Sequence, residues 1–170
     1  MTGLIYNQRD IPRELHRYGL RSSAAVGCGW IAVYNALRLL GQTTDIDALI
    51  RYLQWQLPLI HGNLGTIFWA PRQCFRQWGF DTKLHFDRTR FDAEARDTDA
   101  CILFYHWAKK GTVGAHFVAL HATDAGFVSY NTFSNSTGPD HLGDSLAGFL
   151  RRQRYFGCVL LTIRRKEKNT

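Results

Sequence analysis

The chain has 170 residues, of which 45% are hydrophobic, 14% aromatic and 21% charged. This composition is that of an ordered globular protein, and the length suits one domain with a sizeable core. No run approaches the roughly 18 apolar residues that a membrane span needs, and Arg9, Asp10, Arg13 and Glu14 stand where a signal peptide would be apolar. We therefore expect a single cytoplasmic domain over residues 1–170, with a basic frayed tail over 165–170.

The net charge of +7 favours anionic partners, such as an acidic peptide. Nucleic acid is a less favoured partner because aromatic residues are rarely interleaved with the basic ones and no nucleic-acid motif occurs. The basic residues in question are Lys109, Lys110, Arg151, Arg152, Arg154 and those from Arg164 to Lys168. Nothing in the sequence indicates an oligomeric state.

The four cysteines, Cys28, Cys74, Cys101 and Cys158, are widely and irregularly spaced. They form no CxxC pair and no short Cys/His cluster, so neither a disulfide framework nor a structural zinc site is indicated. We expect no metal and no other cofactor.

The first half of the chain has helical periodicity. An apolar pattern begins directly after Cys28 and ends at Gly41, which is a stop signal. Thr44 or Asp45 can cap a second helix that ends before Pro58. A loop, "HGNLG" (61–65), leads to a third helix from about 66 to 78, unless that helix begins only at Pro71.

The second half alternates as strands do. Strands are predicted over 80–86, over the continuous apolar run 100–107, which suits a central strand, and over 155–163. Residues 115–131 are typical of two strands joined by a tight turn at "TDAG". Short helices are expected within 88–97 and 143–153. N-terminal helices followed by an antiparallel sheet predict an α+β fold.

Cys28 combines several features that a nucleophile needs. Unpaired N–H groups at a helix N-terminus favour the thiolate, which is the reactive form. Gly27 and Gly29 leave room for a substrate, and the N–H of Cys28 is suited to donate to an oxyanion. The alternative is structural, because free cysteines are often buried and small residues commonly flank helix starts.

The base is predicted from the hairpin. If the "TDAG" turn has two or four residues, Val118 faces Asn131, and His116 is the diagonal neighbour of Asn131 on the same face of the sheet. The side-chain carbonyl of Asn131 can then accept the imidazole N–H and leave the other ring nitrogen for the thiol. A three-residue turn would put Asn131 on the opposite face.

The remaining histidines and cysteines are assigned weaker roles. His121 lies at an odd offset from His116, so it should point to the other face as a structural or surface residue. His106 either lines the same cleft or belongs to the core. Histidines without a partner visible in the sequence are His16, His61, His85 and His141. Cys74, Cys101 and Cys158 are interpreted as apolar filling of a helix and two strands.

The segments "GCGW…NALRLLG", "GAHFVAL" and "VSYN" together resemble the papain-like cysteine peptidases. The resemblance is to the compact bacterial branch whose members cleave double-glycine leader peptides on bacteriocin exporters, and to their stand-alone relatives. It spans about 22–164 and implies a papain-like fold with the cysteine at the start of the central helix. It assigns Cys28 as nucleophile, His116 as general base and Asn131 as orienting residue. Trp30 stands where this branch often has a small residue or proline.

One position departs from this pattern. Papain-like enzymes usually carry a glutamine about six residues before the cysteine as a second oxyanion donor, and here that position is Ser22. A serine hydroxyl can donate, but it is shorter and less directional, and loss of one such donor typically costs about a hundred-fold in rate. Gln8 would reach the site only if the chain between it and Cys28 folded back.

The sequence thus favours a thiol-dependent hydrolase or acyl transferase that acts on a peptide or amide bond through Cys28, His116 and Asn131. The alternative, suggested by the missing glutamine, is a catalytically weak or inactive papain-like module that binds peptides.

Overall fold

The computed structural model describes residues 3–56, 65–109 and 111–166. Six antiparallel strands form one sheet in the order β1-β6-β2-β3-β4-β5. The strands are β1 (Asp81–His85), β2 (Ala100–Lys109), β3 (Thr112–Thr123), β4 (Gly126–Tyr130), β5 (Asp140–Gly143) and β6 (Phe156–Arg164). The helices are η1 (Gln8–Asp10), α1 (Ser23–Val26), α2 (Cys28–Leu39), α3 (Ile46–Gln56), α4 (Ala70–Gln77), η2 (Arg88–Arg90), α5 (Phe91–Arg96) and α6 (Leu146–Arg152).

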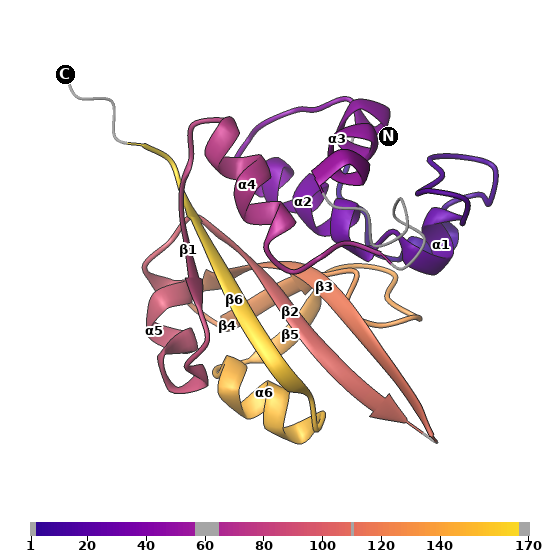
Figure 1. The fold of residues 1–170 in the computed structure, drawn as a ribbon. Coiled ribbons are helices and arrows are strands. Elements are labelled where there is room, and N and C mark those ends of the chain that lie inside the picture. Colours follow the sequence, from indigo (N-terminus) through magenta and orange to yellow (C-terminus); the bar gives the residue numbers. More distant parts are fainter. Residues whose placement is uncertain (1–2, 57–64, 110, 167–170) are drawn as a thin grey trace.

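Helices cover both faces of the sheet (Figure 1). The N-terminal helices α2, α3 and α4 pack on one face, where they bury alternate strand residues such as Ile102 and Phe117. Helices α5 and α6 pack on the other face over the intervening residues, such as Leu103 and Val118. Because successive strand residues point to opposite faces, each strand contributes side chains to two hydrophobic cores, one on each face.

Helix α2 begins and ends where its sequence pattern predicts. It starts at Cys28, and the chain turns at Gly41, whose φ of 71° is a left-handed conformation that glycine adopts without strain. The N–H of Gln42 returns to the carbonyl of Leu37 at 2.9 Å. Every residue from Gly29 to Leu37 is buried, because α2 lies between the sheet and the other N-terminal helices.

Most other predicted elements are present. Asp45, and not Thr44, caps α3 by accepting the N–H of Ala48 at 2.6 Å. Strand β2 is central, as its continuous apolar run predicts. The predicted loop at 61–64 lies outside the described residues.

The helix predicted from about residue 66 begins only at Ala70, next to Pro71, so the later start is the correct one. The elements η1, α1 and β5 were not expected. All three are five residues or shorter, which is too short for a periodic signal.

The N-terminal segment is tied to α2 by a buried asparagine. Asn35 is fully buried, and its side chain accepts the N–H of Ile5 at 2.9 Å and donates to the carbonyl of Ile5 at 2.8 Å. This pairing imitates one rung of a sheet and keeps residues 3–10 against the body of the protein. The chain before Cys28 therefore folds back along α2.

At the other end of the chain, Arg165 donates from its backbone to Asp99 and from its side chain to the carbonyl of Leu40, each at 2.9 Å. Residues 167–170 lie outside the described residues, so the frayed tail stays a prediction. In the described segments, no helix combines the length and the apolarity that crossing a bilayer would demand.

Candidate active site

Cys28 is the first residue of α2 and is half-buried. The short helix α1 ends two residues before it, and Gly27 separates the two helices. The thiol therefore sits at a helix N-terminus, as the sequence predicts.

The residue after the cysteine must be small. A Cβ on Gly29 would overlap the side chain of Thr66, so only glycine lets the 65–67 segment pack against this turn of α2. The hydroxyls of Thr66 and Tyr18 are 2.9 Å apart, and Tyr18 is buried. Tyr18 and Thr66, which are far apart in the sequence, thus pack together at the start of α2.

The N–H groups at the start of α2 favour the thiolate of Cys28, as predicted, but burial has the larger and opposite effect on its pKa. Burial raises the pKa of the thiol to about 11, although the N–H groups of Phe117, Gly29 and Cys28 itself act to lower it. The desolvation of the sulfur thus raises the pKa more than the N–H groups at the helix N-terminus lower it, and the thiol is protonated at neutral pH.

The hairpin has the geometry that the prediction required. Thr123 pairs with Gly126, so the turn has two residues, and Ala119 pairs with Tyr130. Continued by one residue, this register sets Val118 opposite Asn131 and brings His116 diagonally close to it. Nε2 of His116 lies 2.6 Å from an oxygen of Asn131.

That oxygen belongs to the main chain and not to the side chain. The carbonyl of Asn131 can only accept, so the neutral imidazole carries its proton on Nε2 and leaves Nδ1 as the basic nitrogen. Asn131 has a left-handed φ of 64°, a conformation in which asparagine is enriched, and β4 ends just before it. The sequence thus predicted that these two residues meet, but it predicted the side-chain carbonyl as the acceptor where the structure has the main-chain carbonyl.

The side chain of Asn131 is bound to Gln8 instead. Its Oδ1 accepts the N–H of Gln8 at 2.8 Å, and its Nδ2 donates to Oε1 of Gln8 at 3.3 Å. Gln8 also donates from Nε2 to the carbonyl of Ala24 in α1 at 3.0 Å. The sequence showed Gln8 only as an available glutamine, and no local pattern points to these contacts.

Phe117 connects the cysteine to the histidine. It follows His116 in β3, and its N–H acts on the Cys28 sulfur. Among the described residues, no hydrogen bond joins this sulfur to the His116 ring. The Tyr105 ring stands edge-on to His116 at 5.9 Å between centroids, and burial lowers the pKa of the imidazole. The imidazole is therefore neutral at pH 7.

Ser22 is the N-cap residue of α1 and is half-buried. Its side chain makes no capping hydrogen bond, so the hydroxyl is not committed to that helix. The neighbouring Ser23 is committed, since its Oγ accepts the indole N–H of the buried Trp30 at 2.9 Å.

Among the described residues, no hydrogen bond or ring contact joins the other histidines to Cys28. His121 is half-buried and stacks on Tyr130, while His106 packs between Phe104 and Phe156. His16 contacts Asp47 at 2.8 Å, His85 is buried beside Thr162, and His141 is exposed. His61 lies outside the described residues. Cys74, Cys101 and Cys158 are buried, in agreement with their interpretation as filling.

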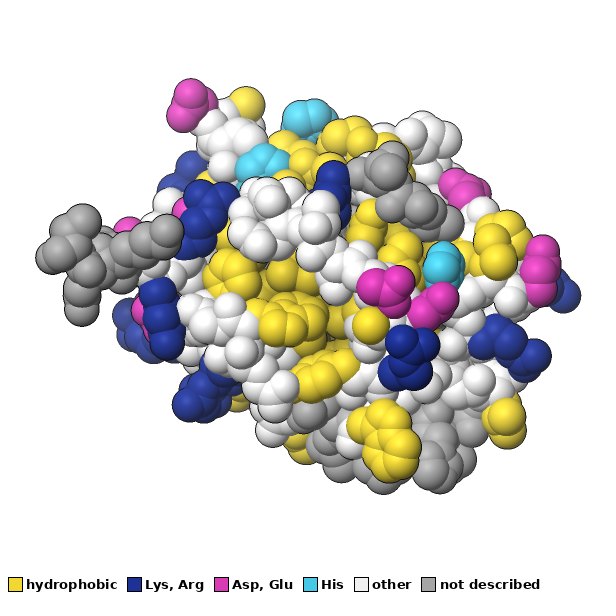
Figure 2. All heavy atoms as spheres, turned by 90° about the horizontal axis from the view of Figure 1, so that it is seen from above, with side chains coloured by type: hydrophobic (Ala, Val, Ile, Leu, Met, Phe, Trp, Pro, Cys, Tyr) yellow, Lys and Arg dark blue, Asp and Glu magenta, His cyan; other side chains and the backbone are white. Residues whose placement is uncertain are grey.

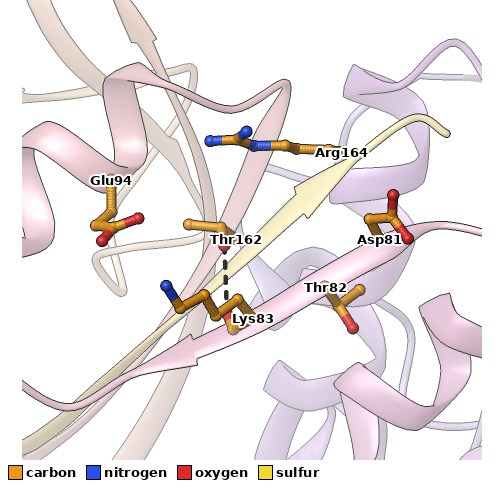
Figure 3. Close-up of a pocket in the computed structure, with 6 residues that line it drawn as sticks. All are labelled: Asp81, Thr82, Lys83, Glu94, Thr162 and Arg164. Carbon is orange, nitrogen blue, oxygen red and sulfur yellow. Dashed lines mark hydrogen bonds between the residues drawn. The ribbon is translucent and has the colours of Figure 1, made fainter. Parts of the chain in front are cut away.

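A hollow of about 250 Å³ lies on the β1–β6 edge of the sheet, and its lining includes none of Cys28, His116 and Asn131 (Figure 3). Its lining carries Lys83 and Arg164 against Asp81 and Glu94, so opposite charges balance there. Within the described ranges, no three His, Cys, Asp or Glu side chains group as metal ligands would. On the face seen in Figure 2, Lys and Arg are scattered among acidic and apolar side chains and form no single basic patch.

The fold is α+β, with N-terminal helices, a cysteine at the start of the central helix, and an antiparallel sheet. It is similar to the peptidase domain of Streptococcus ComA, a bi-functional ABC transporter involved in a quorum sensing pathway. The two share 13% sequence identity with a TM-score of 0.54, over 82% of this chain and 91% of that domain. No protein-family model and no curated protein matches the sequence. The predicted fold class is thus confirmed.

Proposed function

We propose that the protein is a thiol-dependent hydrolase or acyl transferase that acts on a peptide or amide bond, with Cys28 as nucleophile. The observation that carries this proposal is the orientation of His116: Nε2 is held by the carbonyl of Asn131, and β3 continues into Phe117, whose N–H acts on the sulfur. The similarity to a peptidase domain supports a peptide substrate, and the net charge of +7 favours an acidic one.

The reaction begins from a neutral pair, because the pKa of Cys28 is raised and that of His116 is lowered. Nδ1 of His116 takes the thiol proton as the sulfur attacks the substrate carbonyl. The C–N bond then breaks, and the imidazolium gives its proton to the leaving amine. Water, or an acceptor amine in the transfer reaction, attacks the thioester, loses a proton to Nδ1, and regenerates the thiol.

The oxyanion formed in each half of the reaction needs donors. The N–H of Cys28 is the first, and Ser22 is the second candidate because its hydroxyl is not used in capping. Together they occupy the role that a main-chain and a side-chain amide share in papain-like enzymes.

The test is acylation by p-nitrophenyl acetate, with the acetyl group located by mass spectrometry. Wild type should be acetylated at Cys28, and Cys28→Ala should abolish the reaction. Loss of a general base typically costs about 10²–10⁴-fold, so His116→Ala should slow acetylation within that range. His141→Ala is the matched control, because His141 is exposed and lies in β5. A wild type that is not acetylated, or is acetylated only at another cysteine, contradicts the proposal.

The second candidate, a peptide-binding module with little or no turnover, is favoured by the raised pKa of Cys28 and by the serine at position 22. A quenched fluorescent peptide library rich in Asp and Glu separates the two. Cleavage or covalent trapping at Cys28 supports the enzyme, whereas saturable binding of intact peptide alone supports the module.

A further inference from the structure

We propose that Gln8 is a positioning residue of this site, which fixes His116 through Asn131 and keeps the N–H of Cys28 out of a helical hydrogen bond to Ala24. The effect on catalysis rests on the proposed function, while the positioning itself does not. The inference comes from three hydrogen bonds of Gln8 that reach both halves of the site.

The first half is Asn131. Gln8 binds both polar ends of its side chain, with its N–H donating to Oδ1 and its Oε1 accepting from Nδ2. The two contacts determine how the amide of Asn131 is oriented. They also hold the left-handed backbone of Asn131, whose carbonyl faces Nε2 of His116. Gln8 therefore acts on the base through Asn131.

The second half is the break between α1 and α2. In an uninterrupted α-helix the carbonyl of Ala24 would accept the N–H of Cys28, four residues later. Here that carbonyl accepts Nε2 of Gln8 at 3.0 Å. Among the described residues, no backbone hydrogen bond joins Cys28 to Ala24. The N–H of Gly27 donates to the carbonyl of Ser23 at 2.8 Å, and the N–H of Ile31 donates to the carbonyl of Gly27 at 3.1 Å. The amide of Gln8 thus satisfies the carbonyl that a continuous helix would pair with the proposed oxyanion donor.

Gln8 lies on an N-terminal segment that several hydrogen bonds hold in place. Asn7 caps η1 by accepting the N–H of Arg9 at 3.0 Å and donates to the carbonyl of Ser134 at 3.1 Å. Asn35 holds Ile5 on α2. These contacts do not involve Gln8, so its side chain can be changed while the segment stays in place.

Two substitutions separate the roles. Gln8→Ala removes both side-chain contacts and frees the Ala24 carbonyl for the N–H of Cys28. Gln8→Glu retains an acceptor for Nδ2 of Asn131, but the carboxylate has no proton for Ala24. Once protonated, the carboxyl group can donate again, so the defect of Gln8→Glu should fade as the pH falls through the pKa of that group. Gln77→Ala, at the exposed end of α4, is the matched control.

Two readouts test the proposal in the full chain. The first needs no activity: amide hydrogen exchange at Cys28 and the ¹⁵N shifts of the His116 ring. The second compares acylation by p-nitrophenyl acetate, which forms an oxyanion, with alkylation by iodoacetamide, which does not. We expect Gln8→Ala to slow exchange at Cys28, to reduce the Nε2–H tautomer of His116, and to lower the ratio of acylation to alkylation by roughly a hundred-fold, as loss of one oxyanion donor does.

Unchanged exchange and tautomer in a folded Gln8→Ala variant would overturn the inference, as would a Gln8→Glu defect that does not depend on pH. If Gln8→Ala does not fold, Gln8→Glu alone decides, through its exchange rate and pH profile. If wild type is not acylated but Gln8→Ala still slows exchange at Cys28, the positioning role stands and the proposed function fails. If wild type is acylated and Gln8→Ala behaves like Gln77→Ala in both readouts, the proposed function stands and the positioning role fails.

Discussion

The imidazole of His116 is held by the main chain of Asn131, with Nε2 2.6 Å from the carbonyl oxygen, while the Asn131 side chain binds Gln8. The orienting hydrogen bond can therefore survive a change of side chain. What the side chain adds is rigidity in the residue that carries the carbonyl.

Substitution of Asn131 should consequently harm the site much less than substitution of His116. We expect Asn131→Gly, which keeps the left-handed backbone accessible, to slow acetylation of Cys28 only about ten-fold, against about 10²–10⁴-fold for loss of the base. Because Gln8 acts through the same side chain, adding Gln8→Ala should cost less than the two single effects combined. A double-mutant cycle on the acetylation rate measures this, and full additivity would contradict it.

The reactivity of Cys28 should rise with pH well beyond neutrality. Burial raises the pKa of its thiol to about 11, so alkylation by iodoacetamide should not level off near pH 7. Burial also lowers the pKa of His116 from 6.5, so the imidazole stays neutral below pH 6.5, and acetylation should be lost only as the pH falls through that lowered value. Stopped-flow rates from pH 5 to 11 test both limbs. A thiolate plateau at pH 7 that His116→Ala removes would show a pre-formed ion pair and contradict the neutral pair.

Gly29 should be required for packing and not for chemistry. A Cβ there would overlap Thr66, so Gly29→Ala should lower the free energy of unfolding by about 1–3 kcal/mol, the usual cost of overpacking. The same change should cost less in a Thr66→Gly background, where the obstructing side chain is absent. Denaturant unfolding of the four proteins provides the comparison. Gly138→Ala is the control, since a Cβ there meets nothing within 4 Å, and equal losses in both backgrounds would refute the contact.

Asn35 should anchor the N-terminal segment that carries Gln8. Asn35→Ala leaves the N–H and the carbonyl of Ile5 without their buried partner, and we expect a loss of about 2 kcal/mol or more in the free energy of unfolding. Hydrogen exchange over residues 3–10 should accelerate, and Cys28 acetylation should fall with it. Asn135→Ala, at an exposed position, is the matched control. Unchanged exchange in the N-terminal segment would mean that Asn35 only fills space.

Local patterns in the sequence determined the parts of the site that lie within single elements. The apolar periodicity after Cys28 was enough to start the central helix there, since amphipathic spacing and a terminal glycine act over a few residues. The two-residue turn between Thr123 and Gly126 brought His116 and Asn131 together, because register in a hairpin follows directly from turn length.

Tertiary structure decided which atoms of Asn131 form hydrogen bonds and in which direction the pKa of Cys28 is shifted. Asn131 binds His116 by its carbonyl because its backbone is left-handed and Gln8, over a hundred residues away in sequence, claims its side chain. The pKa of Cys28 rises because the packed chain excludes water from the sulfur, and desolvation depends on everything around a group and not on its own helix. Contacts between distant residues and exclusion of solvent have no period along a chain, which is why neither could be predicted from the order of the amino acids.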